Sequence, residues 1–508
     1  MIKTKLRYKN YLSIVFIFLA LILPINQIYS DSIQTNNEKA NKSFDLSPHI
    51  KRAYLLIWQG EPVNPYAENS DTYINGLSYW IGDLRNFIDY LGTNSDASYH
   101  AYVKSANECL ENLSSMPRNS PWYYYCRSEV YTRLAIARVQ KGNNAKGLLA
   151  IREALLLINT MNEKFPDFVP GKKYQYGLTL VGGVLPNQYK GLASFFGIKG
   201  NLKESVKNIK AYYQTLSDPK HEYNFMAAET GFIYALVNLF ITEDFEQVRY
   251  ALDHLPKYTT GECYEVLRTT IYLKLHQSDK VAKILKKICT PTNKPVYPIL
   301  DYYYGQSLLY ECNPKSKFYI ARFIKSFQGD NYIKDAWLKL SWAFQVGGET
   351  RSALNARRLV KTEGTEFIEE DKSAAVEASF PLDNLHLLQG RLYFDGGLYN
   401  LSVLELNQTK LSDNQEDAAQ LYYRYGRSYQ ALKQNTQAIE NYNKAIKISL
   451  KNSYYAPAST YFIGSIYEGN GNKAEAKKYF NRTLKEYKNY PYFNSFELKA
   501  KAGLTRLK

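Results

Sequence analysis

The chain has 508 residues, of which 45% are hydrophobic and 22% charged, and this balance excludes a mostly disordered protein. Its 28 glycines and 18 prolines make up about 9% of the residues, below the roughly 12% of average usage, which favours long helices over a loop-rich β-sandwich. The net charge is +16, but basic residues are scattered among acidic ones without a basic-aromatic motif, so the sequence predicts no nucleic-acid partner.

The first 30 residues have the order of a secretory signal peptide. Residues 1–11 carry four basic residues and no acidic one, residues 12–23 are almost entirely apolar, and the small residue Ser30 precedes Asp31. The apolar run is shorter than the roughly 20 residues that a bilayer crossing needs. We therefore expect an exported protein, periplasmic or associated with the cell envelope. An uncleaved N-terminal membrane anchor is the alternative.

The rest of the chain reads as helices. Residues 31–47 are polar and aperiodic and predict a flexible leader. From residue 48 onward apolar residues recur at spacings of three and four, short turns interrupt them, and no alternating strand pattern persists. No further apolar stretch of 18 or more residues is evident. We expect degenerate helical repeats over 48–290 and more regular repeats with a capping helix over 291–508.

A small residue recurs at the middle of every other predicted helix in the second half. The separations between these positions are 36, 49, 36 and 38 residues, at Gly305, Ser341, Gly390, Gly426 and Gly464. The longest interval contains an acidic connection, 361–382. A small residue lets two helix axes approach closely, and one helical hairpin cannot bury its apolar face alone. The sequence therefore predicts an all-α protein, an α-solenoid of ten to twelve stacked antiparallel helix pairs.

This pattern resembles the tetratricopeptide repeat, whose period is about 34 residues. The resemblance is best at 419–450 and 457–487, and it departs from the family at Leu450, which stands where a late proline is usual. Two further blocks, 177–206 and 297–324, resemble the tetratricopeptide family that includes the inclusion-body-clearance proteins. Members of that family are helical repeat proteins without a known catalytic centre.

The motifs of several chemistries are missing from the sequence. There is no phosphate-binding G-x-x-x-x-G-K-[ST], no H-E-x-x-H and no G-x-S-x-G. The six histidines are scattered, and the acidic run 369–371 is expected to be solvated. We therefore predict no catalytic, cofactor or metal site, and a protein that is not an enzyme.

The tetratricopeptide resemblance implies a concave surface lined by the first helix of each pair. In that family the lining residues are the second, fifth, ninth and twelfth positions, counting the small residue as the eighth. Transferred to this chain, the partner-binding groove consists of Tyr302, Gln306, Asp335, Trp342, Gln345, Arg391, Phe394, Gln420, Tyr423, Arg427, Gln430 and Tyr461. Amides and arginines bond a peptide backbone and carboxylates, while rings supply contact area.

The sequence favours an exported tetratricopeptide-like scaffold that binds a protein or peptide partner. One alternative is a carbohydrate or small-ligand module that uses exposed tyrosine and tryptophan rings. Another is an enzyme whose site lies in the irregular regions 48–120 or 160–200. A basic surface also suits an anionic membrane surface.

The aromatic runs 122–125 and 302–304 are expected to place some rings in the core and others outside, since consecutive helical positions point about 100° apart. The oligomeric state is open.

The five cysteines allow two readings. Export permits disulfides, and the predicted hairpins would bring Cys109 near Cys126 and Cys263 near Cys289, which leaves Cys312 free. The other reading is five reduced, mostly buried thiols. The sequence leaves both open.

We expect cleavage after Ser30. Mass spectrometry of the exported protein should find Asp31 as the new N-terminal residue, because the segment before it has the signal-peptide order. Recovery of intact Met1 in a membrane fraction would instead indicate the uncleaved anchor.

Overall fold

The computed structural model describes residues 44–61, 71–184, 200–382, 384–410, 415–451, 453–490 and 493–507. The predicted signal peptide therefore lies outside the described residues. Within these ranges the chain forms 23 α-helices and no strand, which confirms the all-α prediction. The predicted leader ends earlier than expected, because Leu46 is buried and the Phe44 carbonyl accepts a hydrogen bond from the Tyr73 hydroxyl at 3.0 Å.

The N-terminal half contains eleven of the described helices. They are α2 (Pro48–Gln59), α3 (Thr72–Thr93), α4 (Asp96–Ser114), α5 (Pro121–Gln140), α6 (Asn144–Lys164), α7 (Lys172–Val184), α9 (Leu202–Leu216), α10 (Ala227–Val237), α11 (Phe245–Asp253), α12 (Glu262–Lys274) and α13 (Ser278–Leu285). The start of α5 shows how the sequence sets a boundary. Pro121 occupies its first turn, where a missing N–H costs nothing, and the Ser120 hydroxyl accepts from the Trp122 amide at 3.2 Å.

The C-terminal half contains the other twelve. They are α14 (Ile299–Tyr310), α15 (Ser316–Ser326), α16 (Ile333–Val346), α17 (Thr350–Thr362), α18 (Glu369–Glu377), α19 (Leu385–Asp395), α20 (Tyr399–Leu406), α21 (Gln415–Ala431), α22 (Asn435–Ile448), α23 (Tyr455–Gly469), α24 (Lys473–Glu486) and α25 (Phe493–Arg506). In the described ranges the helices make ten consecutive pairs, from α3–α4 to α23–α24, and α2, α18 and α25 stand outside them. The number agrees with the prediction.

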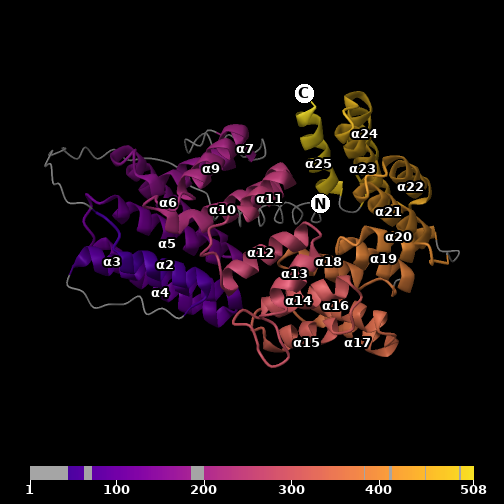
Figure 1. The fold of residues 1–508 in the computed structure, drawn as a ribbon, viewed down its shortest axis with the longest axis horizontal. Coiled ribbons are helices and arrows are strands. Elements are labelled where there is room, and N and C mark those ends of the chain that lie inside the picture. Colours follow the sequence, from indigo (N-terminus) through magenta and orange to yellow (C-terminus); the bar gives the residue numbers. More distant parts are fainter. Residues whose placement is uncertain are drawn as a thin grey trace.

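The pairs follow one another in a curved array (Figure 1). The array curls enough for the turn after α12 to contact the turn after α19. There the His276 ring lies 3.0 Å from the Asp395 carbonyl, and the Ser278 hydroxyl donates to the Gly396 carbonyl at 2.8 Å. Farther on, the carboxylates of Glu468 and then Glu243 raise the pKa of Arg506 on α25. The α10–α11 turn therefore lies near the C-terminal helix.

The small residues lie where two helices of a pair cross. A Cβ atom added at Gly426 would lie 2.5 Å from the Tyr442 ring, and one at Gly464 would lie 2.8 Å from the Phe480 ring. Gly305 and Gly390 are equally close to side chains of their second helices, and Ser341 is fully buried. The spacing read from the sequence therefore marks the helix crossings.

The aromatic runs are buried more completely than predicted. All four rings of 122–125 and all three of 302–304 are buried, so the expectation that some face outward is wrong for both runs. The reason is that these first helices are surrounded. Helix α5 contacts α3, α4 and α6, and α14 contacts α12, α13, α15, α16 and α19.

The acidic connection 361–382 is not a solvated loop over its whole length, because it contains α18. Asp371, in the run expected to be solvated, is fully buried and accepts hydrogen bonds from the amides of Tyr332 at 2.7 Å and Asp335 at 3.0 Å. It thereby caps the start of α16. Burial raises the pKa of Asp371 to about 7, although these two amide donors oppose the rise. The prediction of a solvated run is wrong at this residue.

One stretch of the described chain passes a length and composition test for a membrane span. Asn224–Thr242 has a mean hydropathy of 1.5 over its window, and 67% of that window is buried inside the protein. The sequence prediction that no such stretch exists is therefore wrong. The core helix of a soluble protein passes the same test.

All five cysteines are free thiols in this structure. Four are buried, and neither of the two predicted pairs is joined. Cys263 donates instead to the Tyr297 hydroxyl at 3.1 Å, and burial raises the pKa of the Cys263 thiol to about 11.

Replacing Gly426 by Ala should destabilise the C-terminal repeats by about 1 kcal/mol or more. The added methyl group meets the Tyr442 ring, which is fully buried and stacked on Phe462 at 5.9 Å. Overpacking of this kind costs about 1–3 kcal/mol, more than the roughly 1 kcal/mol that alanine gains in helix propensity. Urea unfolding followed by circular dichroism measures the change.

Gly469→Ala is the matched control, because Gly469 ends α23 with nothing within 4 Å of an added Cβ. This variant should be neutral or more stable by up to about 1 kcal/mol. Equal effects of the two substitutions would contradict the close-crossing interpretation.

Candidate functional site

The first helices of the C-terminal pairs form one continuous surface. Helices α14, α16, α19, α21 and α23 contact one another in that order, and all twelve predicted groove residues belong to them. We call this surface the first-helix face. Seven of the predicted residues are buried, namely Tyr302, Asp335, Trp342, Phe394, Gln420, Tyr423 and Tyr461. The other five are half-buried, namely Gln306, Gln345, Arg391, Arg427 and Gln430.

Between α14 and α16 the face carries a buried ion pair set against rings. The Tyr302 hydroxyl donates to the Asp335 carboxylate, and the Lys339 ammonium lies 2.6 Å from both oxygens of that carboxylate. Lys339 also lies over the rings of Tyr302, at 5.7 Å, and Trp342, at 5.6 Å. The lysine charge is therefore balanced within the protein.

Between α16 and α19 the cation that lies over a ring is an arginine. The Arg391 guanidinium lies 4.5 Å from the Trp342 ring centre. Its Nη1 lies 2.6 Å from a carboxylate oxygen of Glu377 on α18, and its Nε lies 3.8 Å from Asp395. The inserted helix α18 thus supplies the acid that pairs with this arginine.

Between α19, α21 and α23 an arginine lies among rings. The Arg427 guanidinium lies 4.8 Å from the Phe394 ring centre and 4.1 Å from that of Phe462, and it donates to the Tyr423 hydroxyl at 3.4 Å. Gln430, one turn later, accepts from the Tyr442 hydroxyl at 2.7 Å. Cation–ring contacts therefore run along the face from α14 to α23.

Three residues of this line lie outside the groove predicted from the sequence. Lys339, Phe462 and Arg424 were not among the predicted groove residues, although Lys339 and Phe462 join predicted residues to one another. All three occupy the sixth position of their repeat when the small residue is the eighth. Adding that position to the transferred set would have found them.

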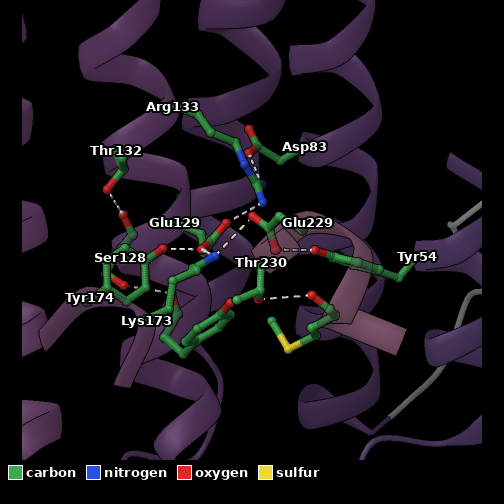
Figure 2. Close-up of polar contacts among 12 residues, drawn as sticks. Tyr54, Asp83, Ser128, Glu129, Thr132, Arg133, Lys173, Tyr174, Glu229 and Thr230 are labelled. Carbon is green, nitrogen blue, oxygen red and sulfur yellow. Dashed lines mark hydrogen bonds and ion pairs between the residues drawn. The ribbon is translucent and has the colours of Figure 1, made fainter. Parts of the chain in front are cut away.

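A second polar cluster lies inside the N-terminal half and connects α2, α3, α5, α7 and α10 (Figure 2). Arg133 contacts Asp83 at 2.8 Å and Glu129 at 2.7 Å. Lys173 contacts Glu129 at 2.7 Å and Glu229 at 3.2 Å. The hydroxyl of Tyr54 donates to Glu229 at 2.7 Å, and that of Tyr174 donates to Glu129.

The acids outnumber the bases in this cluster by three to two, and their pKa values diverge accordingly. Burial raises the pKa of Asp83 to about 6, although Arg133 opposes the rise. Burial would also raise the pKa of Glu129, but Lys173 and Arg133 outweigh it and hold that pKa below its ordinary value. Asp83 thus binds a proton more readily than Glu129.

The cluster brings the carboxylates of Asp83, Glu129 and Glu229 close together. The adjoining cavity, lined in part by Lys173, Tyr212 and Thr230, measures about 10 Å³, room for roughly one water molecule. No group of three or more His, Cys, Asp or Glu residues that could hold a metal ion occurs in the described part of the chain. Its ion pairs and hydrogen bonds join five helices to one another.

A family model described as tetratricopeptide repeat matches residues 417–489. The match spans α21 to α24, the two pairs where the sequence resemblance is best. These two helix pairs are therefore tetratricopeptide repeats. The narrower resemblance to the family of inclusion-body-clearance proteins stays a prediction. No curated protein matches the chain.

Three solved structures with low similarity are the hetero-tetramer Cut9–Hcn1 of the APC/C, a monomeric mutant of IFIT1 with Gppp-AAAA, and the TPR domain of P58(IPK). Identities are 14%, 13% and 12%, and TM-scores are 0.28, 0.30 and 0.20. The alignments cover 86%, 87% and 84% of this chain, and 90%, 96% and 98% of the other chains. Scores at this level carry no functional argument.

Asp83→Asn should flatten part of the pH dependence of stability. The folded pKa of about 6 lies above the ordinary value near 3.8, so the folded protein holds a proton that the unfolded chain has released. The free energy of unfolding of the natural protein should therefore fall as pH rises from about 4 to 6, by up to about 3 kcal/mol from this group. Denaturant unfolding across this range measures it.

The exposed Asp279 on α13 provides the control, and Asp279→Asn should keep the natural slope. An unchanged slope in Asp83→Asn would mean that Asp83 does not hold the extra proton.

Proposed function

We propose that this protein is a scaffold that binds a protein or extended peptide along the first-helix face of its C-terminal half. Tetratricopeptide repeats serve as frameworks for protein–protein interaction, and the family match falls within this half. The observation that carries the proposal is the line of cations and rings that continues across five first helices. A surface continuous over several repeats suits an extended partner.

The half-buried residues supply the polar contacts of such a surface. Arg391 and Arg427 are fixed by the rings beneath them, so little side-chain entropy is lost when a partner bonds their free edges. Half-buried amides at Gln306 on α14 and Gln430 on α21 lie on the same face. Peptide carbonyl and N–H groups are natural partners for amide side chains.

The structure does not favour the carbohydrate alternative. Sugar stacking needs an open ring face, but Trp342 is only 4% exposed and Arg391 lies over it. Tyr423 is 5% exposed and packs against Tyr454 and Tyr455. The rings of the face mainly hold the repeats together and orient the cations.

We further propose that the protein works outside the cytoplasm, in the periplasm or at the cell envelope. The support for this location is the signal-peptide order of residues 1–30. If the segment stays uncleaved, the same scaffold would be anchored to the membrane. A basic net charge also suits contact with an anionic membrane surface.

The double variant Arg391→Ala, Arg427→Ala should weaken partner capture by about 2 kcal/mol, since central arginines often dominate an interface. Arginines are better targets than Trp342 or Tyr423, because removing a buried ring would cost about 3–5 kcal/mol of folding stability. Quantitative affinity purification from the native host, with circular dichroism of each variant, measures both effects.

The matched control is Arg351→Ala, Arg358→Ala, two exposed arginines on the second helix α17. This pair removes the same charge from another surface and should leave capture unchanged. Equal capture by the two folded double variants would show that the partner uses a different surface.

A further inference from the structure

The first-helix face holds an arginine that the protein leaves without a carboxylate. Arg424 on α21 is only 7% exposed, and its Nε is buried with no hydrogen-bond partner. Its guanidinium lies 5.6 Å from the Tyr423 ring centre. No acid in the described part of the chain forms an ion pair with it, although a buried charge normally has such a partner.

The neighbouring Arg427 shows the same deficit. It lies between the rings of Phe394 and Phe462, and its hydrogen bond goes to the Tyr423 hydroxyl. Among the described residues no carboxylate lies within ion-pair distance of it. The other cations of the face, Lys339 and Arg391, each have an acid at 2.6 Å. The cations of this line without an ion pair are therefore the two arginines in the second half of α21.

The two unpaired arginines adjoin the paired one. Burial raises the pKa of the Tyr454 hydroxyl, the charges of Arg424 and Arg391 oppose that rise, and Tyr423 and Glu377 add to it. Helices α19 and α21 are in contact along the face.

We propose that the partner binds through an acidic segment, whose aspartate or glutamate carboxylates pair with Arg424 and Arg427. This inference rests on the proposed function and specifies the chemistry of the partner. Charge complementarity supports it, because the guanidinium groups of Arg424 and Arg427 have no ion-pair partner among the described residues and aromatic rings lie beside them. A guanidinium held flat against a ring presents its N–H edge in a fixed direction, which suits two-pronged bonding to a carboxylate.

The first test pans a random dodecapeptide display library on the full chain. The recovered peptides should contain at least twice the aspartate and glutamate of the unselected library. Panning on Arg424→Gln, Arg427→Gln should lose that enrichment, while panning on Arg351→Gln, Arg358→Gln of α17 should keep it. A pool without acidic enrichment on the natural protein would overturn the inference.

The second test needs no protein variant and so does not depend on variant folding. The most enriched peptide and its glutamate-to-glutamine counterpart are compared by fluorescence anisotropy on the natural protein. The acidic peptide should bind at least tenfold more tightly, and a rise in salt from 50 to 200 mM should narrow the difference only slightly, because salt screens buried charge pairs much less than exposed ones. Equal binding of the two peptides would overturn the inference.

The outcomes separate this inference from the function it rests on. Peptides of neutral composition that bind the natural protein but not Arg391→Ala, Arg427→Ala would support binding along the first-helix face. They would contradict the inference that the partner is acidic. Peptides that bind all variants equally would overturn both, because the first-helix face would not be the binding surface.

Discussion

The close crossing of two helices at a small residue is the constraint on which the C-terminal half depends. At Gly426 and Gly464 the partner helix places a ring where a Cβ would otherwise be. This contact sets how closely the two helices of each pair approach, and its recurrence along the chain stacks the pairs so that their first helices lie side by side. A continuous face exists because the crossing recurs at similar intervals.

The same constraint explains why the aromatic residues are buried. Since each first helix contacts its partner and both neighbouring first helices, rings at consecutive positions all find packing, as the run 302–304 shows. Polar groups on such a helix are then forced to bond within the array. Asp335 accepts a hydrogen bond from Tyr302 and forms an ion pair with Lys339, and Arg391 forms an ion pair with Glu377 of α18. Binding chemistry remains only where that internal pairing is incomplete.

The sequence was informative where a signal is local and periodic. The small-residue spacing predicted the C-terminal pairs, and the turns separated their helices. It was uninformative where a site is assembled from distant residues. Tyr54, Asp83, Glu129, Lys173 and Glu229 come from five helices without a shared motif, and only the packing brings them together. Asp371 was misjudged for a related reason: an acidic run reads as solvated until the start of α16 is known to lie against it.

The two polar clusters therefore have opposite balances of charge. In the N-terminal cluster three acids face two bases, and the excess is relieved when Asp83 takes up a proton. On α21 two arginines lack acids, and an arginine cannot shed its charge near neutral pH because its pKa is too high. An excess carboxylate can be neutralised from solution, but an excess guanidinium needs an anion. The N-terminal cluster can thus lose its excess charge to solution as the pH falls toward 6, while Arg424 and Arg427 keep theirs.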